Sequence, residues 1–350
     1  MSCRNVWKVF GANAARVVGR SDADLPRAEL MAKTGCTVAC RDISFDVRRG
    51  EVFVVMGLSG SGKSTLVRCV TRLIEPTSGK IELCGQDVLG AEPKQLRALR
   101  RTKVSMVFQH FGLFPHRTVL DNVAYGLEVQ GIDKARRYER ARELLTVVGL
   151  SPVESSYPDQ LSGGMQQRVG LARALAVDPE VLIFDEAFSA LDPLIRREMQ
   201  DEVMRLQERL HKTVIFVTHD LDEALKIGDR IAIMKDGRFV QVGAPAEIVG
   251  NPADDYVREF VRDVPRGKVL TAAYATQPHA GGEAPEEVVR HDQRLGELLP
   301  VVFGAKGPIG VVDGSGELVG ILDRRMVIHV LAGREEIAVP EELALDGGQP

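Results

Sequence analysis

Long apolar runs are missing from this sequence of 350 residues, and none approaches the roughly 18 residues that a helix needs to cross a bilayer. The first residues, MSCRNVWKVFG, hold no apolar stretch of the kind found in signal peptides. An excess of positive charge is missing too, because 45 lysines and arginines face 49 aspartates and glutamates, for a net charge of −4. These absences argue against membrane spanning, secretion and sequence-independent binding of nucleic acid.

Cysteines are few and scattered, so no disulfide framework is expected. The five are Cys3, Cys36, Cys40, Cys69 and Cys84. Cys36 and Cys40 could suggest a metal-binding pair, but no second pair and no nearby histidine completes a set of ligands. We therefore expect reduced thiols, as in an intracellular protein.

The composition is that of a globular protein, with 44% hydrophobic and 27% charged residues. The length is about twice that of an average domain, so we expect one large domain with an appendage. Charge is unevenly divided between them. From Asp263 to the end there are 14 acidic and 8 basic residues, a net charge of −6, which leaves +2 for the preceding residues. A near-neutral body precedes an acidic tail.

The order of strand-like and helix-like segments predicts an α/β fold. Short runs rich in Val, Ile and Phe, without polar alternation, indicate strands that are buried on both faces of a sheet. Helical periodicity lies between these runs, which indicates a mostly parallel sheet. The predicted strands are Glu51–Met56, Val104–Phe108, Val181–Phe184, Val214–Val217 and Arg230–Met234, and the clearest helices between them are Lys63–Leu73 and Pro193–Leu210.

Two stretches interrupt this alternation. Residues 114–172 have helical periodicity at Lys134–Val148 and Gly164–Ala176, so we expect a helical subdomain inserted into the sheet domain. Residues 11–36 are polar, with a short helix predicted at Ala23–Lys33 after a Ser-Asp start signal.

The tail is predicted to fold as a small α/β unit of its own. We place the sheet domain at 1–262, a linker at 263–287 that ends in a stretch rich in Gly, Pro and Ala, and the small unit at 288–340. The elements predicted in this unit are a helix at Leu295–Phe303, strands at Gly307–Asp313 and Leu318–Asp323 around a turn at 314–316, and a closing helix at Arg324–Leu331.

The clearest motif is GLSGSGKST at Gly57–Thr65, which matches the phosphate-binding loop G-x-x-x-x-G-K-[ST] between a predicted strand and a predicted helix. Its glycines let successive backbone N–H groups converge on phosphate oxygens at the start of a helix. Lys63 is expected to reach the β and γ phosphates of a bound nucleotide, and the Ser64 hydroxyl to ligate Mg²⁺. The other residues predicted to contact the nucleotide here are Gly57, Ser59, Gly60, Ser61, Gly62 and Thr65.

A second motif follows the apolar run Val181–Phe184, which ends in Asp185 and Glu186. A carboxylate at the end of a buried strand beside a phosphate loop suits a Mg²⁺ ligand, and this is the role expected of Asp185. Glu186 projects differently and is expected to polarise the attacking water. Taken alone, the same pattern also fits an ordinary strand that ends in an acidic turn; the phosphate loop favours the metal site.

The segment LSGGMQQR at Leu161–Arg168 resembles the signature motif of ABC-transporter ATPases. The family's other motifs are present in order, and the similarity covers about residues 4–262. They are the adenine-stacking aromatic Phe10, the Q-loop residue Gln109, the D-loop at Ser189–Asp192 and the switch histidine His219. A Ser-Gly-Gly run alone is usually a loop and a single histidine is usually structural, but six motifs in this order argue against chance. The resemblance implies a P-loop ATPase fold with an inserted helical subdomain.

The resemblance also implies a head-to-tail homodimer that binds ATP. Each ATP would lie between the phosphate loop of one subunit and Ser162, Gly163 and Gly164 of the other. Asp192 would belong to the same nucleotide contact. The serine and glycines precede a predicted helix, so their N–H groups form a second anion-binding segment.

For hydrolysis, the resemblance assigns three residues. Glu186 would orient or deprotonate water, and His219 would hold the γ-phosphate. Gln109 would be a further Mg²⁺ ligand and would report the nucleotide state to membrane partners. Catalysis of this kind needs mainly positioning and charge stabilisation.

Longer phrases narrow the resemblance to the ATP-binding subunits of quaternary-amine importers, which take up glycine betaine, proline betaine or choline. This implies a peripheral location at the cytoplasmic face of the cell membrane, integral-membrane permease partners and, indirectly, an external solute-binding protein. Which amine is transported stays open, because the ATPase subunit does not touch the solute. With 5% aromatic residues and no cluster of them, we expect no aromatic cage for the amine in this chain. The phrases are Met56–Thr65, Leu161–Ala174, Asp185–Met199 and Leu221–Met234.

The segment Pro308–Leu331 resembles the strand-strand-helix portion of a CBS motif. Such motifs usually occur in tandem, and only one copy is evident, so a structural tail and a sensor completed across the dimer both stay open. Two other classes of function are weighed against the importer. An ABC ATPase that acts on nucleic acid or ribosomes is disfavoured by the single cassette and the acidic charge. A module that binds nucleotide without hydrolysis is disfavoured by Glu186 and His219.

Overall fold

The structure, a computed structural model, describes residues 1–109, 111–278 and 285–333. It divides into two compact units, Met1–Ala244 and Pro245–Pro350. This division falls earlier than the predicted end of the sheet domain at residue 262, because the segment after Pro245 packs with the C-terminal part. The Tyr274 hydroxyl donates a hydrogen bond to Asn251 Oδ1 at 2.8 Å. In the described parts of both units, no helix is both long and apolar enough to cross a membrane.

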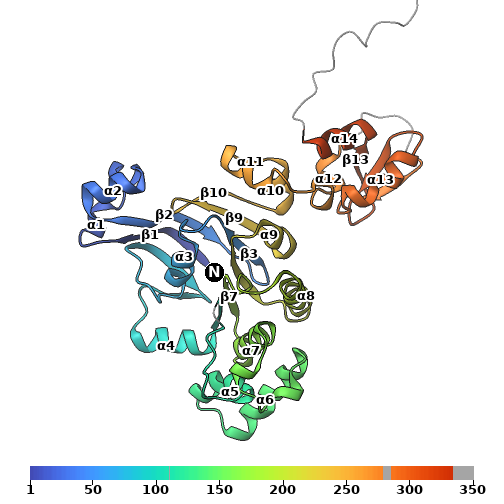
Figure 1. The fold of residues 1–350 in the computed structure, drawn as a ribbon. Coiled ribbons are helices and arrows are strands. Elements are labelled where there is room, and N and C mark those ends of the chain that lie inside the picture. Colours follow the sequence, from blue (N-terminus) through green and yellow to red (C-terminus); the bar gives the residue numbers. More distant parts are fainter. Residues whose placement is uncertain (110, 279–284, 334–350) are drawn as a thin grey trace, which may run out of the picture. The chain divides into compact units, whose positions relative to one another are not determined.

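A six-stranded sheet forms the centre of the first unit (Figure 1). Its strands are β3 (Val52–Met56), β6 (Val104–Phe108), β7 (Val181–Asp185), β8 (Thr213–Thr218), β9 (Arg230–Lys235) and β10 (Arg238–Gly243). Their order is β10-β9-β3-β8-β7-β6, and all neighbours are parallel except β10 and β9. Every residue of β3, β7 and β8 is buried, as the lack of polar alternation predicts. The five predicted strands are confirmed to within one residue at each end, and β10 is an addition to them.

Helices connect these strands. They are α3 (Lys63–Val70), α4 (Pro93–Thr102), α8 (Pro193–Leu210) and α9 (Leu221–Ile227). The bounds predicted for α8 are confirmed: the Asp192 side chain caps its first turn, and His211 ends it in a left-handed conformation. The prediction for α3 is three residues too long. Arg72 leaves the helix with φ +54°, and its Nη1 donates to the carbonyl oxygens of Val88 and Ala91.

A second sheet in this unit was not predicted. It contains β1 (Ser2–Phe10), β2 (Thr37–Asp46), β4 (Ser78–Leu83) and β5 (Gln86–Asp87), in the antiparallel order β2-β1-β4-β5. The pairing of β1 with β2 shifts register after Cys3, Val6 and Lys8. Such irregularities disturb the alternation of inward and outward side chains, so the strand lacks the regular pattern that a search of the sequence relies on.

The polar insert at 11–36 folds onto this second sheet. The predicted helix Ala23–Lys33 is wrong in its first half, where a 3-10 turn, Ser21–Asp24, stands instead. Pro26 precedes α2 (Arg27–Thr34), because proline suits the start of a helix and not its interior. With α1 (Ala14–Val17), these elements enclose a small core of their own, formed by Val9, Val17, Ala23, Leu30 and Cys36.

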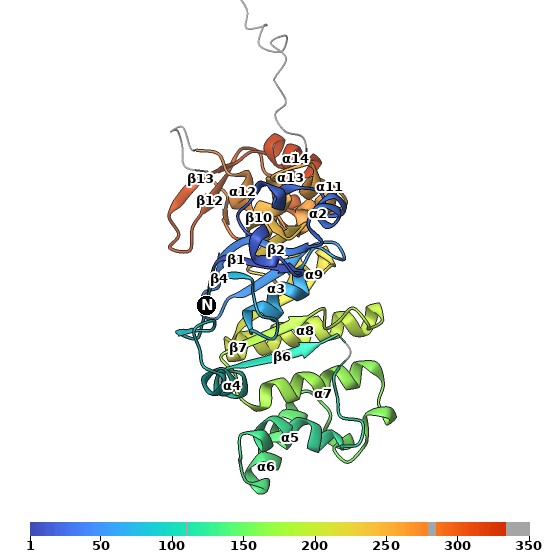
Figure 2. The ribbon, with the colours of Figure 1, turned by 90° about the vertical axis from the view of Figure 1, so that its left-hand side faces the viewer.

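The predicted helical subdomain contains α5 (Val119–Val129), α6 (Lys134–Val147) and α7 (Gly163–Ala176). Figure 2 shows the three helices packed together beside the edge of the parallel sheet. The two helices predicted here are confirmed to within one residue. Because α7 begins at Gly163, the first glycine of the signature motif, most of this motif forms the start of the subdomain's last helix.

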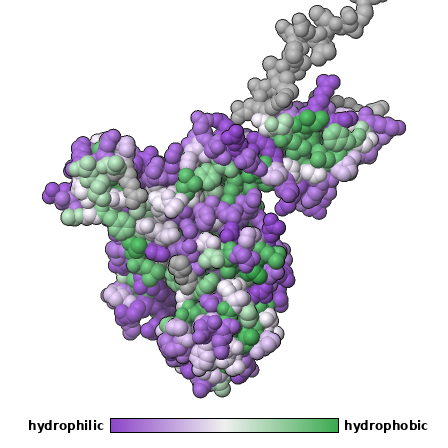
Figure 3. Space-filling model, in the orientation of Figure 1, coloured by the Kyte–Doolittle hydropathy of each residue, from purple (hydrophilic) through white to green (hydrophobic). Residues whose placement is uncertain are grey.

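The second unit contains a three-stranded sheet in the order β11-β12-β13. Its elements are α10 (Pro245–Gly250), α11 (Asp255–Val261), α12 (Ala272–Ala275), β11 (Val288–Arg290), α13 (Leu295–Gly304), β12 (Ile309–Val312), β13 (Leu318–Leu322) and α14 (Arg324–Ala332). The predicted helix, pair of strands and closing helix are all present, and β11 pairs in parallel with β12 as a third strand. Figure 3 shows hydrophobic residues on the surface of this unit. Its exposed large apolar side chains include Phe303 and Ile328.

The linker predicted at 263–287 differs from the structure over its first part. Leu270 and Ala272 are fully buried, Thr271 bridges to Arg294, and Gln277 bridges to Ile321 in β13. Residues up to 278 are therefore part of the packed unit. The prediction relied on a composition rich in small residues, but small side chains such as alanine can also pack in a core. Residues 279–284 of the linker and 334–340 of the predicted unit lie outside the described residues.

All five cysteines are free. Cys36 belongs to the core of the insert and Cys40 to the core between the two sheets, so the candidate pair is divided between two clusters. Within the described residues, no group of three or more His, Cys, Asp or Glu side chains is placed to hold a metal ion by itself.

Candidate nucleotide-binding site

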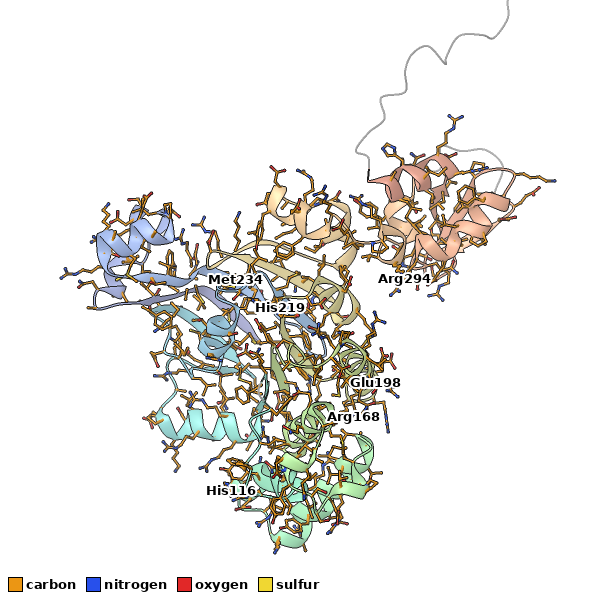
Figure 4. The ribbon with its side chains drawn as sticks, viewed as in Figure 1. His116, Arg168, Glu198, His219, Met234 and Arg294 are labelled. Carbon is orange, nitrogen blue, oxygen red and sulfur yellow. The ribbon has the colours of Figure 1, made fainter. Side chains whose placement is uncertain are left out.

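The phosphate loop connects β3, in the middle of the parallel sheet, to α3. Two of its glycines have no room for a side chain. A Cβ on Gly57, at φ +151°, would lie 2.2 Å from the carbonyl oxygen of Met234, and one on Gly62, at φ +110°, would lie 2.0 Å from that of Ala39. Only glycine allows the loop to bend this closely against β9 and β2, so both residues are needed for its shape. Figure 4 labels Met234 beside this loop.

Lys63 begins α3 and is almost fully buried. Its Nζ donates hydrogen bonds to the carbonyl oxygens of Gly57, at 2.9 Å, and Leu58, at 3.2 Å. It also lies 3.3 Å from Glu186 Oε1. A buried ammonium group requires such partners, and these three oxygens hold its charge at the phosphate loop.

Asp185 ends β7 and is 4% exposed. Its Oδ2 accepts a hydrogen bond from Arg68 Nη2 at 3.2 Å, whereas its Oδ1 is buried without a partner. The Ser61 hydroxyl in the phosphate loop is also buried without a partner. An unpaired buried carboxylate oxygen is unfavourable, so this side chain fits a role as ligand of a cation. Arg68 was not predicted as part of the site, although it lies on the same helix as Lys63.

Glu186 has a strained backbone, with φ +50°. Its N–H donates to the Val217 carbonyl at 3.1 Å, and its carbonyl accepts from the N–H and the hydroxyl of Ser189. These contacts aim the carboxylate between two cations or potential cations: Oε1 at Lys63, and Oε2 at His219 Nδ1, 3.7 Å away. Strain that is fixed by surrounding bonds is typical of functional sites. Half-exposed His219 follows β8 and is labelled in Figure 4.

Gln109 joins this group through the sheet. It follows Phe108, the residue of β6 that pairs in register with Asp185. The carboxyl ends of β3, β6, β7 and β8 therefore carry the phosphate loop, Gln109, the Asp185–Glu186 pair and His219 along one edge. The structure thus brings together the residues predicted for phosphate, metal and water.

The predicted signature residues lie apart from this group. Ser162 and Gly163 are exposed at the start of α7, where the Ser162 hydroxyl accepts from Met165 N at 3.3 Å. Gly164 is buried, and a Cβ there would lie 2.5 Å from Ile195 Cγ2 on α8. Asp192 is exposed and accepts from Leu194 N and Ile195 N. Among the residues described, no hydrogen bond or ion pair joins Ser162–Gly164 or Asp192 to the phosphate loop.

Phe10 and Lys8 lie at the end of β1. The Phe10 ring is 43% exposed, and Lys8 Nζ lies 4.7 Å from its centroid. Exposure of so large an aromatic ring at a strand end fits the predicted stacking on a base.

Glu223 on α9 supports the segment that carries His219, and it gives a prediction on pH. Burial, reinforced by the charge of Asp220, raises its pKa above the ordinary value of 4.5. The folded protein therefore binds this proton more tightly than the unfolded chain. Stability from this group is complete below pH 4.5. It falls by about 1.4 kcal/mol per pH unit as the pH rises from there to the raised pKa.

We expect Glu223→Gln to remove this fall, because glutamine fills the same space without charge and can still accept from Gln200 Nε2. Urea midpoints of both proteins between pH 4.5 and 8 measure the effect, with Glu198→Gln on the surface of α8 as the control. If the stability of Glu223→Gln and that of the unchanged chain fell equally as the pH rises, the raised pKa of Glu223 would not be the cause of the fall.

Comparisons with known proteins agree with this geometry. Residues 40–189 match the family model described as ABC transporter. The glycine betaine transport ATP-binding protein OpuAA of Bacillus subtilis (strain 168) is 46% identical, over 95% of this chain and 92% of its own length. The trimethylamine N-oxide transport system ATP-binding protein TmoW of Ruegeria pomeroyi (strain ATCC 700808 / DSM 15171 / DSS-3) is 49% identical, over 95% and 96%.

A solved structure gives the same family. It is a dimeric ATP-binding cassette in a post-hydrolysis state, bound to ADP and Pi, with 31% identity and a TM-score of 0.58 over 69% of this chain and 97% of that one. Relatives that match nearly end to end, together with a phosphate loop, carboxylate pair and histidine on one edge of the sheet, lead to one conclusion. The chain belongs to the ATP-binding proteins of ABC transporters, and it is an ATPase.

Proposed function

We propose that this chain powers the import of a quaternary ammonium compound, such as glycine betaine, proline betaine or choline. It would act as a peripheral subunit at the cytoplasmic face of the cell membrane, bound to integral-membrane permease subunits that receive the solute from an external binding protein. The observation that carries the proposal is the match over 92% of the length of a protein named for glycine betaine transport.

Trimethylamine N-oxide is a second candidate solute. Two relatives named for its transport match this chain over 96% and 98% of their own lengths, at 49% and 46% identity. Like glycine betaine, this solute carries three methyl groups on a formally charged nitrogen. The solute is recognised by other subunits, so the identity of this chain to each relative does not rank the two.

ATP would bind with its phosphates in the loop Gly57–Thr65 and its base on Phe10. Lys63 would donate to the β and γ phosphates, exchanging part of its contact with the loop carbonyls for phosphate oxygens. Glu186 would accept a proton from the attacking water, and His219 would donate to the γ-phosphate. The 3.7 Å between the Glu186 and His219 side chains supports this pairing.

Mg²⁺ would be held by Ser64, Gln109 and Asp185 together with the phosphates, and it would neutralise charge that develops during phosphoryl transfer. The unpartnered Oδ1 of Asp185 supports its part in this site. The position of Gln109 directly after the register partner of Asp185 supports its own part.

A head-to-tail homodimer would complete the site. The exposed Ser162–Gly163 segment opens α7, a helix of 14 residues whose N-terminus favours an anion. Asp192 would lie at the same contact. That the solved relative bound to ADP and Pi is dimeric supports this arrangement.

The C-terminal unit would be a single CBS-like motif. The order β11, α13, β12, β13, α14, with β11 parallel to β12, supports this, and it extends the resemblance beyond the strand-strand-helix portion. The net charge of −6 from Asp263 onward would make its contacts sensitive to salt, since exposed charges are screened within about 8–10 Å at physiological ionic strength.

The solute is tested by ATPase activity of the complete transporter, reconstituted with permease and binding protein. We expect stimulation by glycine betaine, proline betaine or choline, measured beside trimethylamine N-oxide and a neutral amino acid as the control. Stimulation by the N-oxide alone would replace the quaternary amine with the second candidate. Indifference to all four methylated amines would reject the proposed solute class.

A further inference from the structure

The segment that follows Gln109 has an unusual backbone. Phe111 and Gly112 are consecutive residues in the left-handed region, with φ +51° and +58°. For a bulky L-residue such as phenylalanine this conformation costs about 1–2 kcal/mol. Such strain persists only where neighbouring groups fix it, and it concentrates at functional sites.

Arg173, near the end of α7, fixes this segment. Its Nη1 donates to the Gly112 carbonyl at 2.5 Å, and its Nη2 donates to the Phe111 carbonyl at 2.9 Å. Burial lowers the pKa of Arg173, and no carboxylate of the described residues pairs with it. Arg173 is partly buried, and its two hydrogen bonds go to backbone carbonyls. A partly desolvated cation held in this way is costly compared with an apolar side chain, so packing alone does not account for an arginine here.

Other residues of α7 contact the same segment. A Cβ on Gly163, in the signature motif, would lie 3.8 Å from Phe111 Cζ, and one on Gly170 would lie 3.6 Å from the Phe111 carbonyl oxygen. Phe111 therefore lies along α7 from its first turn to Arg173. The helix that presents Ser162–Gly164 is also the helix that holds the segment next to Gln109.

The next residues of the loop are fastened to the helical subdomain as well. Fully buried Asn122 of α5 accepts from Phe114 N and donates from Nδ2 to the carbonyls of Phe114, Arg117 and Thr118, at 2.8–3.1 Å. From Phe111 to Thr118 the loop is thus bound to α5 and α7, while Gln109 stays at the end of β6.

We propose that Arg173 is a positioning residue. It makes the loop Phe111–Thr118, called here the Gln109 loop because it follows that residue, move as one body with the signature segment Ser162–Gly164. The inference deepens the proposed function, because it rests on ATP-driven closure of a dimer. Metal coordination at Gln109 in one site would then shift the signature segment that the same subunit offers to the other site. The planar fork of arginine suits two adjacent carbonyls, and the single ammonium of lysine does not.

The test uses Arg173→Met, which keeps an unbranched apolar stem and removes both donors, in a Glu186→Gln background. We expect ATP binding to the monomer to change less than threefold. The ATP concentration for half-maximal dimer formation should rise about 10-fold or more, the equivalent of one charge-assisted hydrogen bond. In the chain with Glu186 intact, the KM for ATP should rise by a similar factor with little change in kcat.

The matched control is Arg100→Met. Arg100 on α4 also donates to two backbone carbonyls, those of Thr71 at 3.0 Å and Arg72 at 2.6 Å, but it contacts neither α7 nor the Gln109 loop. Arg173→Lys serves if the methionine variant fails to fold, since it retains the positive charge at this position. We expect it to lie between the unchanged chain and Arg173→Met.

A second readout separates this inference from the proposed function. Hydrogen exchange is followed in peptides that cover 105–118 and 160–170, with and without ATP and Mg²⁺. In the parent we expect ATP to slow hydrogen exchange in both peptides. In Arg173→Met we expect it to slow exchange in only one of the two peptides. If the parent fails to form a dimer, the proposed closure is wrong. Hydrogen exchange in the monomer then still shows whether the Gln109 loop and Ser162–Gly164 are coupled. Unchanged dimer formation and joint protection in a folded Arg173→Met variant would overturn the role of Arg173.

Discussion

Glu186→Gln is expected to lower the ATP turnover of this chain by about 10²- to 10⁴-fold, the usual contribution of a general base. The carboxylate is the only acceptor aimed at both Lys63 and His219, at 3.3 Å and 3.7 Å, among the described residues. Glutamine keeps the shape and the backbone contacts of this residue but cannot accept a proton. ATP binding should be retained or improved, because Lys63 loses a competing anion.

Turnover and nucleotide affinity are measured separately for this variant, by phosphate release and by binding of a fluorescent ATP analogue. The control is Glu198→Gln, which removes a carboxylate from α8 whose contact is Arg168 Nη2 at 3.5 Å; both residues are labelled in Figure 4. Turnover within threefold of the unchanged chain would show that Glu186 does not activate water. Loss of ATP binding would place it in binding instead.

Lys63→Ala is expected to weaken ATP binding about 10- to 100-fold, the loss of a charge-assisted hydrogen bond to phosphate, and to reduce turnover by a further 10²- to 10³-fold. The side chain is 4% exposed, and its ammonium is directed by two loop carbonyls. Lys63 is the only lysine or arginine in the loop Gly57–Thr65. Its loss therefore leaves this loop without a cation of its own for the phosphates.

The control for Lys63 is Lys103→Ala, which breaks another lysine–glutamate pair of this sheet. Lys103 pairs with Glu180 just before β6 and β7 begin, at the opposite end of the strands that carry Gln109 and Asp185. We expect it to bind ATP as the unchanged chain does. Equal loss in both variants would indicate general damage to the sheet, and ATP binding by Lys63→Ala within threefold of normal would contradict the assigned role.

The parts of the site that the sequence predicts are those whose chemistry is contiguous along the chain. The phosphate loop needs its glycines, lysine and serine within nine residues, between a buried strand and a helix, so one short segment specifies both structure and ligand. The register of parallel strands then places Asp185 beside Phe108 and hence near Gln109, as the alternation of strands and helices implies.

The contacts that the sequence does not predict join residues that are far apart. Arg68 donates to Asp185, and Arg173 donates to the carbonyls of Phe111 and Gly112, more than sixty residues away. Every residue has a backbone carbonyl oxygen, so the sequence does not indicate which of these oxygens accepts a hydrogen bond from a distant side chain. The irregular strand β1 and the packed segment before residue 278 were missed for a related reason. Their burial depends on register shifts and on small side chains that fit between other elements.

The most direct test of the account is uptake of labelled glycine betaine by proteoliposomes that contain this chain with the permease and binding protein proposed for it. We expect accumulation that requires ATP inside the compartment that this chain faces. It should disappear with Glu186→Gln while ATP binding is retained. Uptake that continues in the variant, or ATP hydrolysis that never moves any methylated amine, would contradict the conclusion that this ATPase drives import of a quaternary ammonium compound.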